Sequence, residues 1–222
     1  YIDLARLYNR KGMVDSVEHY IRLLKEEPAA FQFNTPIRRL QAEYYVSEER
    51  YGDAIQVYTS LVDSLIGNGD YNVDVLGETY TDLADVYLYD LEAPEPALDN
   101  YQRAIYTLSS EDLSEDAGDN PRSASLYDQV SLISALKGKS TALGLLASQS
   151  GGTNGRSLRE VAWRTVRLGL DFVERLRADF QTAEDRAKLI EESYLLYHTA
   201  LEHCLAMSVT FEQQAWVDSA FI

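Results

Sequence analysis

The run Gly138-Lys139-Ser140 matches the end of a phosphate-binding P-loop, in which a glycine-rich loop and a lysine hold nucleotide phosphates. A P-loop also requires a glycine five residues before Gly138, where this chain has Ile133, and a strand that leads into the loop. The surrounding residues instead follow a helical pattern, which provides no loop of backbone N–H groups for phosphate. We therefore interpret Gly138 as a position at which two helices come into contact.

A second set of reactive side chains comprises His198, Glu202, His203 and Cys204. On a helix, His198 and Glu202 share one face because four residues separate them, whereas His203 and Cys204 point elsewhere. Two ligands rarely suffice to hold a metal. Cys204 also falls on the apolar stripe of this helix, where a thiol is usually an inert packing group. We therefore predict neither a metal site nor a nucleophile here.

Glu78, Asp82 and Asp85 could act as paired carboxylates in acid–base catalysis. Nothing else of catalytic use converges on them, so we interpret them as part of a solvated helix face. Four arginines between residues 156 and 167 form a basic cluster. We interpret this cluster as a second solvated face, with docking against the acidic part of a neighbouring copy as the alternative. The chain is predicted to have no catalytic, cofactor-binding or metal-binding residues and not to be an enzyme.

Helices must position all of these side chains. Apolar residues recur at steps of three and four, the period of a helix; examples are Leu158, Val161, Ala162, Leu168, Phe172, Val173, Leu176 and Phe180. Ser157 and Glu160 have the spacing of a capping box, which begins a helix. We predict two long helices of about 25 residues each, over 157–181 and 183–208. No stretch alternates with period two between hairpin turns, so the predicted fold class is all-α.

The composition excludes several classes of protein. The 222 residues are 45% hydrophobic and 25% charged, which is typical of soluble globular proteins. No apolar run approaches the roughly 20 residues that span a bilayer. The net charge of −16 would repel the phosphates of nucleic acid. The single cysteine excludes an internal disulfide. We expect a cytoplasmic protein that binds neither nucleic acid nor a membrane and requires no cofactor.

The acidic residues are concentrated in one part of the chain. Between residues 41 and 128 the sequence has 20 acidic and 3 basic side chains, whereas the remainder has 16 acidic and 17 basic. Of the 16 tyrosines, 14 lie at or before Tyr127. This acidic, tyrosine-rich part favours a protein or peptide partner that carries lysine or arginine near its contact segment.

We expect a single domain over 1–222, because no break in the helical pattern is long enough to be a domain linker. Residues 109–121 are acidic and short of apolar side chains, and we expect them to be mobile. Residues 150–155, with the sequence SGGTNG, are predicted to form a flexible connector. The domain would contain about four or five helix pairs, namely three repeats over 1–108 and pairs of longer helices over 123–222.

Residues 1–108 contain a pattern that occurs three times. A tyrosine late in one helix is followed nine or ten residues later by a smaller residue: Tyr8 by Val17, Tyr45 by Ala54 and Tyr87 by Ala97. The turn at 93–96 would absorb the additional residue of the third pair. Two further packing residues follow in each repeat: Ile21 and Leu24, Tyr58 and Leu61, and Tyr101 and Ala104. The pattern resembles the tetratricopeptide (TPR) repeat, which implies an α-solenoid of antiparallel helix pairs in a right-handed superhelix.

A second resemblance covers roughly the final 90 residues. Segments 135–139, 171–177 and 185–204 occur in an order similar to the repeat region that precedes the caspase-like CHAT domain of bacterial TPR–CHAT proteins, and 214–221 resembles the start of that family's last repeat helix. The chain has no CHAT domain, so the family's His/Cys dyad has no counterpart. Because the chain begins and ends within helical patterns, we expect a fragment of a longer protein.

In a TPR array the first helices of successive pairs line a concave groove. The repeat alignment places these side chains there: Arg6, Asn9 and Arg10 in the first repeat, Arg39, Glu43 and Ser47 in the second, and Glu78, Thr81, Asp85 and Tyr89 in the third. Asp82, which lies next to Thr81, is a further candidate for partner binding. We expect both Asp82 and Asp85 to face solvent. Arginine, carboxylate, amide and tyrosine side chains on one wall suit an extended polar or basic peptide.

Two function hypotheses follow. The first is a non-catalytic interaction scaffold or sensor module, which binds a peptide or partner protein and regulates a CHAT effector domain absent from this chain. The second is an α-helical domain with small-molecule binding or an unrecognised enzymatic activity in the groove. A groove that binds nothing, with polar residues that only keep it soluble, is the remaining alternative. The first hypothesis is favoured because the sequence brings together no catalytic base, nucleophile or set of metal ligands.

Overall fold

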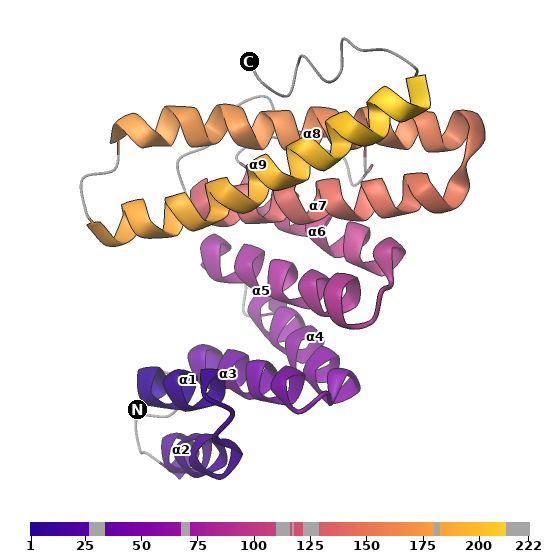
Figure 1. The fold of residues 1–222 in the computed structure, drawn as a ribbon. Coiled ribbons are helices and arrows are strands. Elements are labelled where there is room, and N and C mark those ends of the chain that lie inside the picture. The colour runs from indigo at the N-terminus through magenta and orange to yellow at the C-terminus, as the bar shows by residue number, and fades with distance from the viewer. Residues whose placement is uncertain are drawn as a thin grey trace. The chain divides into compact units, whose positions relative to one another are not determined.

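The computed structural model describes residues 1–26, 34–67, 72–109, 116, 118–121, 129–179 and 183–211. All regular structure in these ranges is helical and none is strand, which confirms the predicted all-α class (Figure 1). Most of 109–121, predicted to be mobile, and 214–221, predicted to begin a helix, lie outside the described residues. None of the helices in these ranges has both the length and the apolar character required to cross a lipid bilayer.

The chain forms two compact units, of which the N-terminal unit is Tyr1–Asn72. Its described helices are α1 (Ile2–Arg10), α2 (Val14–Glu26), α3 (Asn34–Ser47) and α4 (Tyr51–Gly67). α1 packs against α2 and α3, and α3 also packs against α2 and α4. The first helices of the two pairs, α1 and α3, are therefore neighbours.

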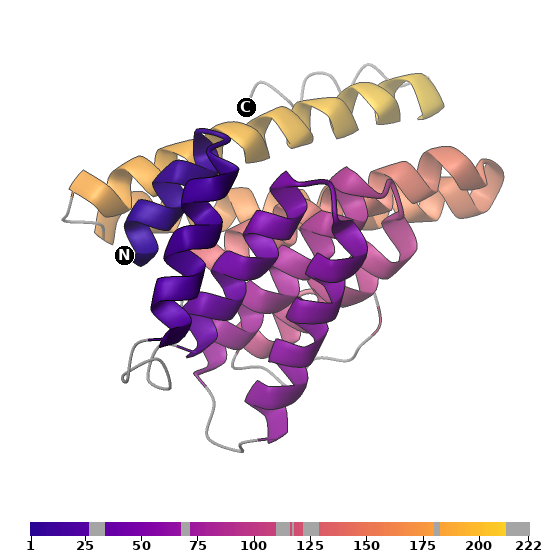
Figure 2. The same ribbon diagram turned by 90° about the horizontal axis from the view of Figure 1, so that it is seen from below.

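The C-terminal unit, Val73–Ile222, contains the remaining described helices. They are α5 (Val73–Asp85), which continues into the π-helical turn η2 (Val86–Asp90), α6 (Pro94–Leu108), α7 (Gln129–Ser150), α8 (Gly152–Asp179) and α9 (Ala183–Phe211). α5 pairs with α6 and α7 pairs with α8, while α7 also contacts α5. α9 contacts both α7 and α8 and crosses them obliquely (Figures 1 and 2).

Three of the described helix pairs are joined by turns of the same geometry. In each turn, the carbonyl of a tyrosine in the first helix accepts a hydrogen bond from the amide of the residue just before the second helix. These bonds join Met13 N to Tyr8 O (3.0 Å), Arg50 N to Tyr45 O (2.8 Å) and Ala93 N to Tyr87 O (2.8 Å). The residue before each donor has a left-handed backbone, with φ of 66° at Gly12, 57° at Glu49 and 50° at Glu92.

The third turn contains the one additional residue that the repeat alignment requires. We predicted that the turn at 93–96 absorbs it, and this prediction is wrong. The residue is absorbed within η2, where the amide of Leu91 bonds to the carbonyl of Val86 five residues earlier. A π-turn of this kind is the usual result of one residue inserted into a helix. Pro94 is already the first residue of α6, where the missing N–H removes no helical bond.

The predicted packing residues of the three second helices are all buried. Each is at most 8% exposed: Val17, Ile21 and Leu24 in α2, Ala54, Tyr58 and Leu61 in α4, and Ala97, Tyr101 and Ala104 in α6. Small side chains at 17, 54 and 97 allow the two helices of a pair to approach, and the larger ones fill the space beyond. The repeat pattern therefore predicted correctly which face of each second helix is buried.

The two long helices are present and unbroken, as predicted, with 28 residues in α8 and 29 in α9. The predicted start of α8 at Ser157 is wrong, because the helix begins at Gly152. Gly151 and Gly152 have φ of 61° and 54°, a left-handed backbone that glycine adopts without steric cost. This backbone allows a connection of a single residue, so most of 150–155 is helix rather than a flexible connector.

Candidate functional site

The N-terminal unit brings together predicted groove residues from α1 and α3. Arg6 donates through Nε and Nη2 to the carboxylate of Glu43, at 3.3 and 3.2 Å. Asn9 Nδ2 donates to the backbone carbonyl of Glu43 at 3.4 Å, and Ser47 Oγ donates to Asn9 Oδ1 at 2.7 Å. These side chains share one face, as the alignment predicted, but their polar groups bond largely to one another. Arg39 lies partly buried on α3.

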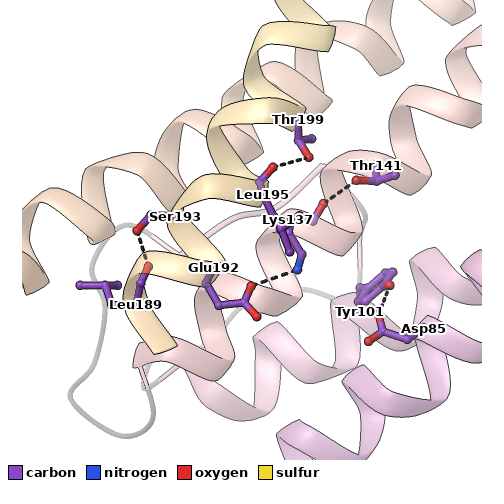
Figure 3. Close-up of polar contacts among 9 residues, drawn as sticks. All are labelled: Asp85, Tyr101, Lys137, Thr141, Leu189, Glu192, Ser193, Leu195 and Thr199. Atoms are coloured by element: carbon purple, nitrogen blue, oxygen red, sulfur yellow. Dashed lines mark hydrogen bonds and ion pairs between the residues drawn. The ribbon is translucent and has the colours of Figure 1, made fainter. Parts of the chain in front are cut away.

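A set of polar side chains in the C-terminal unit extends over α5, α7 and α9. We call it the polar strip and define it as Glu78, Asp85, Tyr89, Ser131, Lys137 and Glu192. Ser131 Oγ donates to Glu78 Oε1 at 3.3 Å, which joins α7 to α5. Lys137 Nζ and Glu192 Oε2, 3.0 Å apart, join α7 to α9 (Figure 3). Both members of this ion pair are less than one-fifth exposed, so solvent screens their attraction only in part.

Asp85 ends α5 and accepts a hydrogen bond of 2.5 Å from the Tyr101 hydroxyl of α6 (Figure 3). Burial raises the pKa of Asp85 to about 6, although the Tyr101 hydroxyl and the charge of Lys137 act in the opposite direction. The prediction that Asp85 faces solvent is therefore wrong. The reason is the fully buried ring of Tyr101, which directs its hydroxyl at the carboxylate. Asp82 is also partly buried.

Tyr89 is the exposed aromatic side chain of the polar strip. It lies within η2, four residues after Asp85, and 55% of its surface is exposed. Glu78 and Thr81, also predicted for the groove, are respectively partly buried and buried on α5. Thr81 donates to the backbone carbonyl of Gly77, so its hydroxyl is used within the helix.

The run Gly138-Lys139-Ser140 lies in the middle of α7, so it forms no phosphate-binding loop. A Cβ atom at Gly138 would lie 2.2 Å from the ring of Tyr101, which confirms the predicted contact between helices. Lys139 is fully buried. Its Nζ donates to Gln102 Oε1, the Asp119 carbonyl and Asn120 Oδ1 at 2.7, 2.6 and 2.9 Å. Burial lowers the pKa of Lys139 to about 7. The amine thus holds residues 119–120 against α6 and α7.

Ser140 and His203 form a hydroxyl–imidazole pair that we did not predict. Ser140 Oγ lies 2.8 Å from His203 Nε2 and 2.8 Å from the carbonyl of Ala162, to which it donates. Since the serine has one proton, His203 Nε2 is the donor in the other bond. Burial lowers the pKa of His203 to about 4, which keeps the imidazole neutral. Both side chains are buried, so the pair holds α7, α8 and α9 together and offers no substrate access.

The other reactive side chains of α9 point in different directions. His198 Nδ1 lies 3.5 Å from Glu202 Oε1, so these two share an exposed face as predicted. His203 and Cys204 are buried. Within the part of the chain that the structure describes, no three His, Cys, Asp or Glu residues are placed to hold a metal ion.

An open pocket of about 320 Å³ lies between α2 and α3. Its lining residues are Glu18, Ile21, Arg22, Lys25, Glu26, Gln41, Tyr44, Tyr45 and Arg50. Tyr44 donates to Glu18 at 2.8 Å, and burial together with this bond raises the pKa of Tyr44 to about 12. The Arg50 guanidinium lies 4.4 Å from the centre of the Tyr45 ring. The sequence pattern did not reveal this pocket, because the pocket depends on how α2, α3 and the turn at Arg50 are aligned with one another.

No family model, no curated protein and no solved structure matches the chain significantly. The resemblances to TPR and CHAT-associated repeats therefore depend on the residues of this chain alone.

Proposed function

We propose that the chain is a non-catalytic interaction module of TPR-like helix pairs, which binds an extended basic segment of a partner protein along the polar strip. One observation carries the proposal. Within each unit, the first helices of successive pairs lie side by side, and polar side chains link them, Arg6 to Glu43 and Ser131 to Glu78; Lys137 in turn links α7 to Glu192 of α9. Such a row of first helices is the surface that helical repeat proteins use for extended partners.

Two further features support the TPR-like assignment. The three turns share one hydrogen-bond pattern and a left-handed residue at the same position. The packing residues predicted from the TPR alignment are all buried in the second helices. A right-handed solenoid of these pairs, as in TPR arrays, is part of the proposal. By its resemblance to CHAT-associated repeats, we further propose that the module regulates such an effector domain.

The charge of the polar strip favours a basic partner. Asp85 and Glu78 belong to the part of the chain with 20 acidic and 3 basic residues, and Tyr89 adds an exposed aromatic surface beside them. Acidic surfaces of this kind accelerate the association of positively charged segments, an effect that weakens as salt rises. The pKa of Asp85 near 6 means that its charge, and with it part of the attraction, is lost in mild acid.

The probe is a labelled peptide of about 12 alternating lysine and glycine residues, and the control is the same peptide with glutamate in place of lysine. Binding is measured by fluorescence anisotropy at about 50 and 300 mM salt. We expect the lysine peptide to bind more tightly at low salt and the glutamate peptide not to bind. Tyr89→Ala should weaken binding severalfold, whereas Asp171→Asn, an exposed change on α8, should not. Equal binding at both salt concentrations, or no effect of Tyr89→Ala, would show that the polar strip is not the binding surface.

The pocket between α2 and α3 supports a second candidate function, the binding of a small molecule. Its volume of about 320 Å³ is at the lower end of ligand pockets. Tyrosine rings and Ile21 form apolar walls. The lining has three cations, Arg22, Lys25 and Arg50, against two carboxylates, Glu18 and Glu26, and this excess of positive charge suits an aromatic carboxylate. To test this candidate, benzoate and indole-acetate are titrated into the protein and the amide NMR signals of α2 and α3 are followed. Shifts that Lys25→Glu abolishes would support it, and no shifts at millimolar ligand would exclude it.

A further inference from the structure

α9 carries an apolar stripe that faces away from the core of the C-terminal unit. The stripe consists of large side chains that are 39–70% exposed: Ile190, Tyr194, Tyr197, Leu201 and Leu205. Their spacing of three or four residues places them along one side of the helix. From Ile190 to Leu205 the stripe covers about 22 Å, or four helical turns. Single exposed apolar residues are normal on a protein surface, but a contiguous row of five is not.

The adjacent side of α9 is already packed. Leu189, Leu196, Ala200 and Met207 are buried, and α9 contacts α7 and α8. A helix with apolar side chains on two sides is usually covered by other protein segments on both of them. Within the described ranges, nothing covers the second side.

The stripe borders α8 along one edge. The Tyr197 hydroxyl donates to Glu174 Oε1 at 2.7 Å, and the guanidinium of Arg177 lies 5.9 Å from the centre of the Tyr197 ring. Arg167 and Leu170 precede Glu174 at steps of three and four residues, so they lie on the same face of α8. The stripe and this face of α8 therefore lie side by side and form one surface, with an apolar part on α9 and a polar edge on α8.

The α8 edge of this surface carries a net positive charge, in contrast to the chain as a whole. Glu174 is already engaged by the Tyr197 hydroxyl and by Arg177, which lies 2.9 Å away. Arg167 is exposed and has no ion-pair partner among the described side chains. The α8 sequence contains six arginines and four acidic residues, whereas the net charge of the chain is −16. A carboxylate on a bound partner would meet the guanidinium of Arg167 on this edge and, further along it, that of Arg177, which already pairs with Glu174.

We propose that this surface of α8 and α9 binds an amphipathic helix of a partner protein, whose apolar side covers the stripe and whose acidic flank faces Arg167 and Arg177. Amphipathic helices commonly bind by laying their apolar side against an apolar surface of helices, and the row of five exposed side chains on α9 offers such a surface. The required partner helix has about four turns, with apolar residues at positions i, i+4, i+7 and i+11. This site goes beyond the proposed function, because it prefers an acidic partner rather than a basic one and lies on a different face of α9 from Glu192.

The probe is a labelled amphipathic peptide of about 18 residues with leucine on one side and glutamate along one flank. Two control peptides have lysine in place of glutamate, or the same composition in scrambled order. In fluorescence anisotropy with the full chain, we expect the glutamate peptide to bind at least tenfold more tightly than either control. Binding of the scrambled peptide with equal affinity would overturn the proposal.

Variants then locate the site. Ile190→Glu and Tyr194→Glu change the two most exposed residues of the stripe, and we expect each to weaken binding at least tenfold. Tyr106→Glu, at a residue of α6 that is 46% exposed, is the matched control and should leave binding unchanged. Arg167→Glu should lower affinity for the glutamate peptide and raise affinity for the lysine peptide. Tyr89→Ala should have no effect, which separates this site from the polar strip.

Two other occupants would be recognised in the same experiments. If the chain dimerises in sedimentation equilibrium and Tyr194→Glu abolishes the dimer, a second copy covers the stripe and the proposal is wrong. The last possibility is tested in a Trp163→Phe background, in which Trp216 is the single tryptophan. If adding Tyr194→Glu to this background shifts the Trp216 emission in the absence of peptide, residues of the same chain cover the stripe. That result would also overturn the proposal.

Discussion

Gly138 of α7 lies directly against the ring of Tyr101 of α6, because a Cβ atom at Gly138 would be only 2.2 Å from the ring carbon Cε1. The two helices therefore meet at a position that accepts only glycine. The ring is fully buried and its hydroxyl bonds to Asp85. One close contact between two helices therefore determines the environment of a carboxylate on a third.

Replacement of this glycine should be costly. Gly138→Ala would force the Tyr101 ring to move, and overpacking of this kind costs about 1–3 kcal/mol of the free energy of unfolding. Gly52→Ala is the matched control, because it lies in α4 with no atom within 4 Å of the added methyl group, and alanine favours a helix by about 1 kcal/mol. Urea unfolding of both variants measures the difference. A neutral Gly138→Ala would mean that α6 and α7 are not in contact there.

Asp85 should make the stability depend on pH. Its folded pKa of about 6 lies above the unfolded value, so the folded state binds more protons and the contribution of Asp85 to stability is lost as pH rises from about 4 to 6. Asp85→Asn removes this loss and should raise the free energy of unfolding at pH 7 by roughly 1–3 kcal/mol, with little effect at pH 4. Urea unfolding at both pH values tests this, and a less stable variant at pH 7 would contradict it.

His203 should resist protonation. Its folded pKa of about 4 lies below the unfolded value, so the stability it contributes above about pH 6.5 is lost as pH falls towards 4. The NMR signal of His203 Hε1 should therefore not shift until the pH is below about 5. A His203 signal that titrates near pH 6.5 would show that the bond to Ser140 does not persist in solution.

The turns offer a paired test of backbone geometry. Glu92 has φ of 50°, a left-handed backbone that costs a residue with a side chain about 1–2 kcal/mol. Glu92→Gly should raise the free energy of unfolding by about 0.5–1 kcal/mol after the entropic cost of glycine. Gly12→Ala, at φ of 66° with open space around it, should lower it by about 1 kcal/mol. Thermal unfolding checks both, and a shift in the same direction for the two variants would contradict this account.

The sequence was sufficient to predict features that depend on one helix or on neighbouring helices. Helical periodicity predicted the all-α class and the long α8 and α9, and the repeat alignment predicted the buried residues of α2, α4 and α6. It also placed Arg6 and Glu43 on one face, which their ion pair confirms. These predictions succeed because they require only the period of a helix and the order of the pairs.

The sequence was not sufficient where the register between distant helices decides the contact. Lys137 meets Glu192 and Ser140 meets His203, at separations of 55 and 63 residues, only because α9 crosses α7 at one particular level. The repeat alignment ended at residue 108 and assigned no groove positions to α7 or α9, so it missed half of the polar strip. Asp85 was misjudged for the same reason, because its burial depends on Tyr101 of a neighbouring helix.

The π-turn η2 has a consequence for how arrays of helix pairs diverge. An additional residue in a loop leaves both helices as they were, but an additional residue within a helix rotates every later side chain by about 100° around the axis. In this chain the rotation affects Tyr89 and Asp90, while the turn that follows and the buried face of α6 remain equivalent to those of the other pairs. A single inserted codon can thus give one pair a new outer surface at no cost to its core, so neighbouring pairs of common ancestry can come to recognise different partners.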